Sequence, residues 1–276
     1  MPRAHNGTVE LEYEAFGEGP ETILLVNGLG AQMTRWPEAF CNLLVARGYR
    51  AVRMDNRDAG LSTWMTGPYA LADMSDDAFC VLDAVGAGRA HIAGVSMGGM
   101  IVQRMAIDHP ERVMSMTSIM SAPGAPGTLT PTPEAAIVLN VPLPDPATDY
   151  DAFVAGGMKN ARTIGSPGYP WGEAELRTRV ESEYRRAYNP PGVARQMAAI
   201  RGAGDRTESL KALSLPVVVL HGVDDPLVPP IGGKATAAAI PGAELHMIPG
   251  MGHDLPPGLY DIFLDAILSA VSRTSP

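Results

Sequence analysis

Gly94-Val95-Ser96-Met97-Gly98-Gly99 is the segment from which the rest of this chain can be interpreted. A short apolar segment, 90–93, precedes it, and a segment with helical apolar spacing, 100–107, follows it. A serine between glycines on a sharp turn from strand to helix forms the pattern G-x-S-x-G, the nucleophile elbow. Side chains at the glycine positions would make strand and helix collide. The pattern therefore predicts an exposed nucleophile, Ser96, at the carboxyl end of a central strand; the alternative is a turn that only packs a strand on a helix.

Composition narrows the class of protein. The 276 residues suit one large α/β domain or a domain with an insertion, and 46% apolar residues are enough for a sizeable core. The net charge of −9 argues against a nucleic-acid partner. Cys41 and Cys80 lie outside any C-x-x-C pair, so we expect small helical residues and no disulfide. No segment resembles a signal peptide or reaches the length of a membrane span, so we expect a soluble cytoplasmic protein without a membrane partner.

Apolar patterns on both sides of the elbow alternate between strand and helix. Continuous or alternating apolar runs predict strands at 9–14, 22–26, 49–54, 90–93, 113–120, 216–222 and 244–248. Helical spacing and terminal glycines predict helices near 36–47, 74–85, 100–107, 232–240 and 258–272. The fold class predicted is α/β, with a mostly parallel central sheet and helices on both faces.

The alternation stops between residues 122 and 204. The first part of this block is rich in Pro and Gly, and the second part carries two helical stripes, Leu176-Val180-Tyr184-Tyr188 and Val193-Met197-Ile200. We predict a core domain formed by 1–121 and 205–276, with a helical cap at 122–204 whose stripes bury against the sheet edge around Ser96. The alternative, a mobile linker, does not account for the stripes.

A nucleophilic serine needs a base, and the base must follow a strand because all strand ends of a parallel sheet meet at one edge. Among six histidines, His253 alone combines a position after a strand with flanking glycines, in Gly250-Met251-Gly252-His253. His221 ends a strand and is the second candidate.

The orienting acid should come from another strand end. Asp224 and Asp225 follow the strand at 216–222, which gives the chain order Ser, Asp, His. Asp225 is favoured over Asp224, and the other carboxylate is expected to shape the Asp-Pro turn.

An oxyanion hole needs two N–H donors. The residue after the nucleophile, Met97, supplies one, and Leu29 in the loop after the strand at 22–26 is the best candidate for the other. Gly28 and Gly30 allow the backbone of this loop to approach closely.

Together these segments resemble the α/β-hydrolase superfamily over nearly the whole chain. The resemblance rests on 27–30, 55–62, 94–99, 221–229 and 250–253, and within the superfamily it is greatest to the subgroup of aclacinomycin methylesterase and related carboxylesterases. It supports Asp225, because the family's acid precedes a Pro-Leu-Val-Pro-like tail. Asn27 stands where the family usually has His, which puts the hydrogen bonding of that loop in doubt. The segment 55–62 is interpreted as structural, with Arg57 and Asp58 bracing it.

The favoured function is hydrolysis of small to medium carboxylic esters, without cofactor or metal. A carbon–carbon bond hydrolase or a cofactor-free perhydrolase on the same residues is the alternative, and a non-catalytic binding protein would be expected to lack one of them. Four methionines suggest an adaptable apolar site or ordinary core: Met33, Met97, Met100 and Met158. Four cap arginines suggest a substrate carboxylate or, preferably, solvated helix faces: Arg185, Arg186, Arg195 and Arg201.

Overall fold

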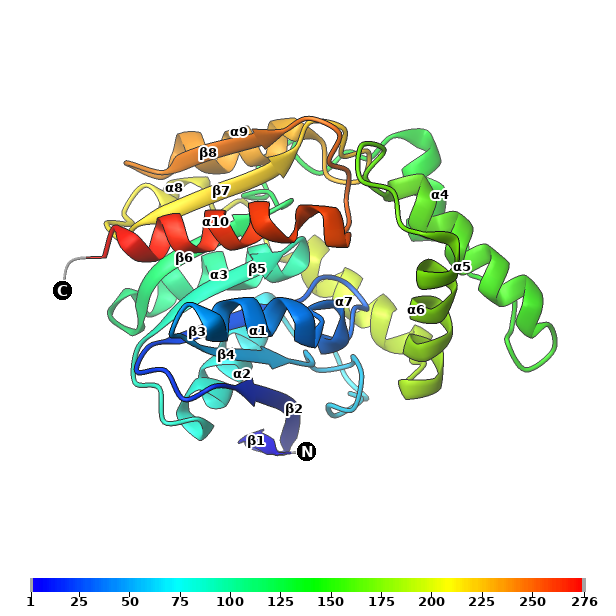
Figure 1. Cartoon of the computed structure of the whole chain (residues 1–276), viewed down its shortest axis with the longest axis horizontal. Coiled ribbons are helices and arrows are strands. Elements are labelled where there is room, and N and C mark those ends of the chain that lie inside the picture. The colour runs from blue at the N-terminus through cyan, green and yellow to red at the C-terminus, as the bar shows by residue number, and fades with distance from the viewer. Residues whose placement is uncertain (1, 275–276) are drawn as a thin grey trace.

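An eight-stranded sheet forms the centre of the computed structural model, which describes residues 2–274 (Figure 1). Met1, Ser275 and Pro276, the outer ends of the predicted core domain, lie outside the described residues. The strand order is β1-β2-β4-β3-β5-β6-β7-β8. The strands span β1 Arg3–Asn6, β2 Val9–Phe16, β3 Thr22–Val26, β4 Arg50–Met54, β5 Ala90–Val95, β6 Val113–Ile119, β7 Val217–Gly222 and β8 Glu244–Ile248.

Strands β3 to β8 are parallel, and β1 and β2 are antiparallel additions at one edge. All five residues of β3 and all six of β5 are buried, as expected for strands covered on both faces. The prediction of a mostly parallel sheet is therefore confirmed.

Helices cover both faces of the sheet, as predicted (Figure 1). On one face α1 (Glu38–Ala46) and α10 (Tyr260–Ser272) pack in a core that contains Trp36, Phe40 and Phe263. On the other face lie α2 (Leu71–Ala84), α3 (Met97–Asp108), α8 (Thr207–Leu210) and α9 (Pro230–Ala239). Single 3₁₀ turns occur at η1 (Met33–Arg35), η2 (Pro110–Arg112) and η3 (Pro257–Leu259).

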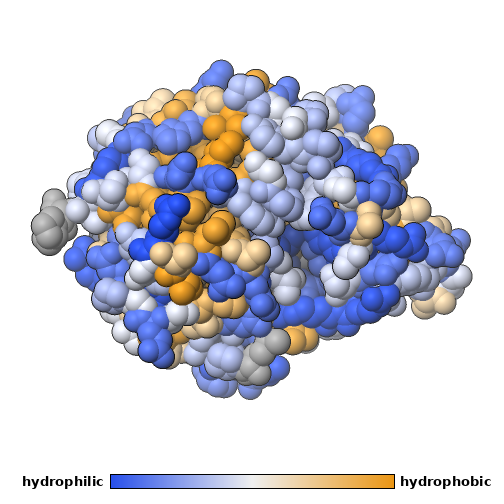
Figure 2. All heavy atoms as spheres, in the orientation of Figure 1, coloured by the Kyte–Doolittle hydropathy of each residue, from blue (hydrophilic) through white to orange (hydrophobic). Residues whose placement is uncertain are grey.

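Four of the helices between β6 and β7 lie beyond the carboxyl ends of the strands. They are α4 (Pro133–Asn140), α5 (Tyr150–Ile164), α6 (Glu173–Arg186) and α7 (Pro190–Gly202), and α4, α5 and α6 among them stand at the right of Figure 1. We call this group the cap; its boundaries as a domain, 122 and 204, stay a prediction. On the face drawn in Figure 2 the cap is mostly hydrophilic, whereas apolar side chains gather over the core.

The predicted burial of the α6 stripe against the sheet edge is wrong. Leu176, Val180 and Tyr184 pack instead with Phe153, Val154 and Met158 of α5 in a small separate core. A helix stripe needs an apolar partner, and α5 provides one within the cap. Tyr188 lies past the end of α6, and its ring contacts the ring of Phe153 in a T-shaped arrangement.

In the second stripe, on α7, Ile200 does pack against the sheet's core, but Val193 is 38% exposed. Within residues 2–274, every helix is too short or too polar to cross a lipid bilayer.

Candidate active site

Ser96 occupies a strained turn between β5 and α3. Its φ of 56° and ψ of −120° lie in a region that residues with a side chain rarely adopt. Hydrogen bonds hold it there: the Ser96 N–H donates to the Ile119 carbonyl at 2.9 Å, and the Ser121 hydroxyl donates to the Ser96 carbonyl at 2.8 Å.

Neighbouring glycines make this turn possible. A Cβ atom at Gly94 would collide with the Gly98 carbonyl, and one at Gly98 would collide with the carbonyls of Val26 and Asn27. The glycines therefore let the turn pack closely against the start of α3 and let α3 pack against the end of β3, as a nucleophile elbow requires.

His253 reaches Ser96 from the loop after β8. Its Nε2 lies 2.9 Å from the Ser96 Oγ, and its backbone N–H donates to the Ile164 carbonyl at 2.7 Å. The loop can pass this close to the cap because Gly250 has a φ of 76° and a Cβ at Gly252 would meet the Gly165 carbonyl. Only 7% of the His253 side chain is exposed.

Asp225 lies on the far side of the imidazole, in the turn after β7. Its Oδ2 is 2.7 Å from the His253 Nδ1, and its Oδ1 accepts the N–H groups of Leu227 and Val228 at 2.9 Å each. Asp224, exposed, instead accepts the Gly250 N–H at 2.7 Å. The structure thus brings Ser96, His253 and Asp225 into one chain of hydrogen bonds and leaves Asp224 in the turn.

His221, the second candidate base, is fully buried and contacts Asp225 rather than Ser96. Its Nε2 donates to the Val228 carbonyl at 2.8 Å and lies 3.6 Å from the Asp225 Oδ2. Burial lowers the pKa of His221, so the ring is neutral behind the carboxylate.

The loop after β3 lies against the serine. A Cβ atom at Gly28 would lie 3.0 Å from the Ser96 Cβ and 3.5 Å from its Oγ. Within residues 2–274, the N–H groups of Leu29 and Met97 donate no hydrogen bond, as the predicted oxyanion hole requires. Over the same residues, the buried Asn27 side chain has no partner for either its Nδ2 or its Oδ1, which agrees with the doubt about its hydrogen bonding.

Segment 55–62 connects the core to the cap. Asp55 accepts the Met33 N–H and pairs with Arg186 at 2.7 Å, and Asp58 pairs with Arg195 at 2.7 Å. Two of the cap arginines therefore link the cap helices to segment 55–62, and their interpretation as solvated side chains is wrong.

The other two cap arginines and Arg57 have simpler surroundings. Arg185 is exposed and pairs with Glu181, and the exposed Arg201 lines a cavity of about 640 Å³ under the cap. Arg57 braces the 55–62 segment through Asp77, with its Nε at 2.6 Å from the carboxylate.

A cavity of about 640 Å³ lies under the cap, lined by His253 together with cap residues such as Leu143 between α4 and α5, Tyr184 of α6 and Met197 of α7. It is partly open to solvent rather than enclosed. Met33, Met97, Met100 and Met158 do not line it, because all four are buried in the cores. They are ordinary core residues, as the simpler of the two interpretations had it.

Asp254, next to His253, was missed in the sequence. Its carboxylate accepts the N–H and hydroxyl of Ser166 at 3.0 and 2.5 Å and the Trp171 indole N–H at 3.0 Å. Burial raises the pKa of Asp254, and the hydrogen bonds from Ser166 and Trp171 together with the positive charge of Arg179 oppose the rise. The only sequence signal was an acid adjacent to His253, because its partners lie more than 80 residues away.

The sequence of this chain is similar to those of known hydrolases. The family model described as alpha/beta hydrolase fold matches residues 21–256. The chain is 27% identical to rhodomycin D methylesterase DnrP of Streptomyces peucetius over 95% of each chain. It is 28% identical to a 2-hydroxy-6-oxononadienedioate/2-hydroxy-6-oxononatrienedioate hydrolase of Burkholderia vietnamiensis, over 89% of this chain and 85% of the relative.

Among solved structures, the meta-cleavage product hydrolase CumD of Pseudomonas fluorescens superposes with a TM-score of 0.80 at 18% identity, covering 99% of this chain and 97% of that one. This likeness concerns the fold. The chain belongs to the α/β hydrolase family, and its resemblance to the methylesterase subgroup is confirmed.

Proposed function

We propose that this protein is a serine hydrolase that cleaves small to medium carboxylic esters through an acyl-enzyme. The observation that carries the proposal is the continuous line from Ser96 Oγ to His253 at 2.9 Å and from His253 to Asp225 at 2.7 Å. Similarity to a methylesterase supports ester cleavage as the reaction.

In the proposed mechanism His253 Nε2 takes the proton of Ser96 as its Oγ attacks the ester carbonyl. Asp225 keeps the imidazole in the tautomer that can accept this proton and stabilises the imidazolium that forms. The N–H groups of Leu29 and Met97 stabilise the oxyanion of the tetrahedral intermediate. His253 then protonates the leaving alkoxide, and water repeats the sequence on the acyl-enzyme.

Strain at Ser96 suits this role. A positive φ costs on the order of 1–3 kcal/mol and persists where the surrounding structure fixes it. Here the strained turn places the Ser96 hydroxyl within reach of His253, and the Met97 N–H at the start of α3 has no acceptor among the described residues.

A carbon–carbon bond hydrolase is the second candidate, favoured by the similarity to the oxononadienedioate hydrolase. Such an enzyme needs an electron-withdrawing diketone substrate, so turnover of plain esters separates the two reactions. Perhydrolysis would show as peracid formation from hydrogen peroxide. A non-catalytic binding protein would show neither.

The test is labelling and turnover of one variant. A fluorophosphonate probe should label the wild-type protein and leave Ser96→Ala unlabelled, because the nucleophile is missing. Turnover of p-nitrophenyl butyrate by Ser96→Ala should fall by roughly 10³-fold or more. Ser209→Ala, at an exposed serine of α8, is the matched control, and this variant should still be labelled by the probe. Near-normal turnover by Ser96→Ala would exclude Ser96 as the nucleophile.

A further inference from the structure

Arg179 on α6 has a guanidinium that pairs with no carboxylate of residues 2–274, at the junction between the cap and the core. Its Nε is buried without an acceptor, and within residues 2–274 none of its donors forms a hydrogen bond and no carboxylate oxygen lies within 4.0 Å. Nearby arginines differ: Arg35 is paired with Glu183 and Arg186 with Asp55. Arg179 is only partly buried, but its Nε is shielded from solvent and lacks an acceptor, so we expect a bound molecule to supply the missing partner.

The carboxylates nearest to Arg179 are already engaged. Arg35 binds both oxygens of Glu183, and Asp254 accepts from Ser166 and Trp171. Burial first, and the charge of Arg35 next, lower the pKa of Arg179 to about 10, so the group stays charged at neutral pH. Its guanidinium lies 4.8 Å from the centre of the Trp171 ring, which fixes its position without satisfying its N–H groups.

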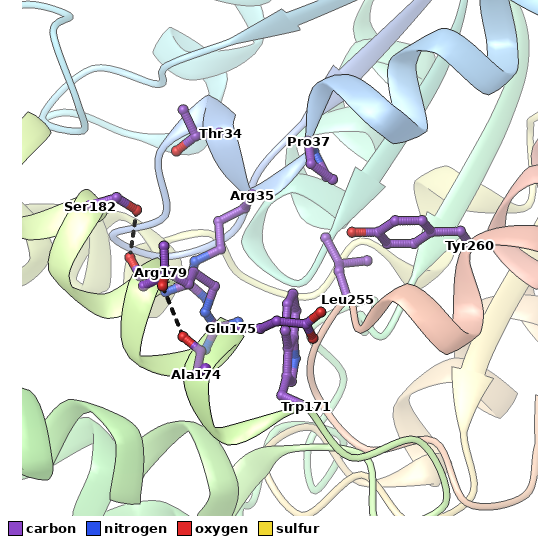
Figure 3. A pocket seen from close by; sticks show the side chains of 11 residues that line it. Thr34, Arg35, Pro37, Trp171, Ala174, Glu175, Arg179, Ser182, Leu255 and Tyr260 are labelled. Atoms are coloured by element: carbon purple, nitrogen blue, oxygen red, sulfur yellow. Dashed lines mark hydrogen bonds between the residues drawn. The ribbon is translucent and has the colours of Figure 1, made fainter.

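Arg179 also lies at the wall between two cavities. It lines the cavity of about 640 Å³ that contains His253, and a second one of about 440 Å³ between α6 and the start of α10. Figure 3 shows Arg179 beside Arg35 in this second cavity, with Trp171, Leu255 and Tyr260 around it. A molecule bound beside His253 can therefore present a group to Arg179.

We propose that Arg179 is a specificity-determining residue that binds a free carboxylate on the substrate. The inference rests on the proposed esterase function and names the substrate class: esters that carry a second, unesterified carboxylate. A planar guanidinium with open donors matches a carboxylate in a bidentate arrangement. A neutral ester of the same length leaves those donors unsatisfied.

The test compares mono-p-nitrophenyl adipate with p-nitrophenyl hexanoate, which differ only in the terminal carboxylate. The wild-type protein should favour the adipate ester in kcat/KM by at least about tenfold. Arg179→Gln should lower the ratio of the two kcat/KM values by roughly 30-fold, because a charge-assisted bond is lost, and Arg179→Lys should lower it less. Arg185→Gln, on the same helix but exposed and lining neither cavity, should keep the wild-type ratio.

A wild-type preference for the hexanoate ester, or an unchanged ratio in Arg179→Gln, would show that Arg179 only braces Trp171 and would overturn the inference. Because the measurement is a ratio, a general loss of activity cancels. Calorimetric binding of adipate to Ser96→Ala separates this inference from the esterase proposal. Binding that weakens with Arg179→Gln supports the carboxylate site even where no ester is turned over, and no binding contradicts it.

Discussion

Replacing Asp225 by Asn changes one atom of the carboxylate that contacts His253. The amide oxygen of the new side chain can still accept the N–H groups of Leu227 and Val228, which Asp225 Oδ1 binds at 2.9 Å. The new NH₂ group must then face the His253 Nδ1, where the wild-type oxygen lies at 2.7 Å. A donor at this place forces Nδ1 to accept, so the ring proton moves to Nε2.

That tautomer points an N–H at Ser96 and has no lone pair to take its proton. It also removes the negative charge that stabilises the imidazolium. We therefore expect Asp225→Asn to lower kcat by roughly 10³- to 10⁴-fold, which corresponds to about 4–5.5 kcal/mol of transition-state stabilisation. Folding should change much less, since both backbone hydrogen bonds remain and each contributes only about 0.5–1.5 kcal/mol.

Asp224→Asn is the matched control. Its Oδ2 accepts one backbone N–H, from Gly250, at an exposed position, and an amide oxygen can do the same. We expect its kcat/KM for p-nitrophenyl butyrate to stay within about threefold of wild type. Steady-state kinetics and thermal unfolding of both variants provide the comparison.

Two results would refute this reasoning. Greater damage from Asp224→Asn would assign the orienting role to Asp224, and a loss under tenfold in Asp225→Asn would mean that another group orients the ring. Non-additivity gives a further check. Asp225→Asn combined with Ser96→Ala should be no slower than Ser96→Ala alone, because residues that act as one unit lose their function together.

Two other predictions concern the cap and its attachment. For p-nitrophenyl esters of increasing acyl-chain length, kcat/KM should rise until the chain fills the cavity and then fall. The rise should be roughly fourfold per methylene, because burying one methylene contributes about 0.8 kcal/mol. Activity that appears only on emulsified triglyceride would mean that the cap is a lipase lid. Burial opposes ionisation of Asp58, but hydrogen bonds from Arg195, the Met65 N–H and Tyr69 lower its pKa below the ordinary 3.8. The ionised Asp58 carboxylate therefore stabilises the folded protein above pH 3.8, and this stabilisation is lost as the pH falls through the pKa of Asp58 in the folded state. Urea unfolding at pH 7 and pH 3 should thus show a larger loss for wild type than for Asp58→Asn, whose amide side chain tolerates the φ of 68°; equal losses would contradict it.

The sheet and the elbow were predictable because their signals are local. β3 and β8 begin and end at the predicted residues. For β3 the reason is its continuous apolar run, which a strand covered on both faces requires, whereas β8 is a partly exposed edge strand. β1 gave no such signal: of Arg3–Asn6 only Ala4 is buried, and the strand exists because β2 offers it an edge. The positions of Ser96 and His253 followed from glycine patterns whose steric reason acts within a few residues.

Pairing between distant side chains was not predictable in the same way. Arg179, Arg185 and Arg186 lie on one helix and look alike in sequence, yet one is unpaired, one is exposed and one pairs with Asp55. The difference depends on the few ångströms that tertiary packing sets. A helix stripe shows which face is apolar but not what covers it, so the packing of α6 on α5 could not be read from spacing.

The connection between the cap and His253 limits how the cap can move. The His253 N–H donates to the Ile164 carbonyl at the end of α5, the Gly252 N–H donates to the Ser166 hydroxyl, and the Asp254 carboxylate accepts from Ser166. Displacing this part of the cap as a lid would break bonds that hold the imidazole 2.9 Å from the Ser96 Oγ. Substrate is therefore expected to enter through the existing opening of the cavity while α5 stays in place, because an opened lid would separate the base from the nucleophile that it serves.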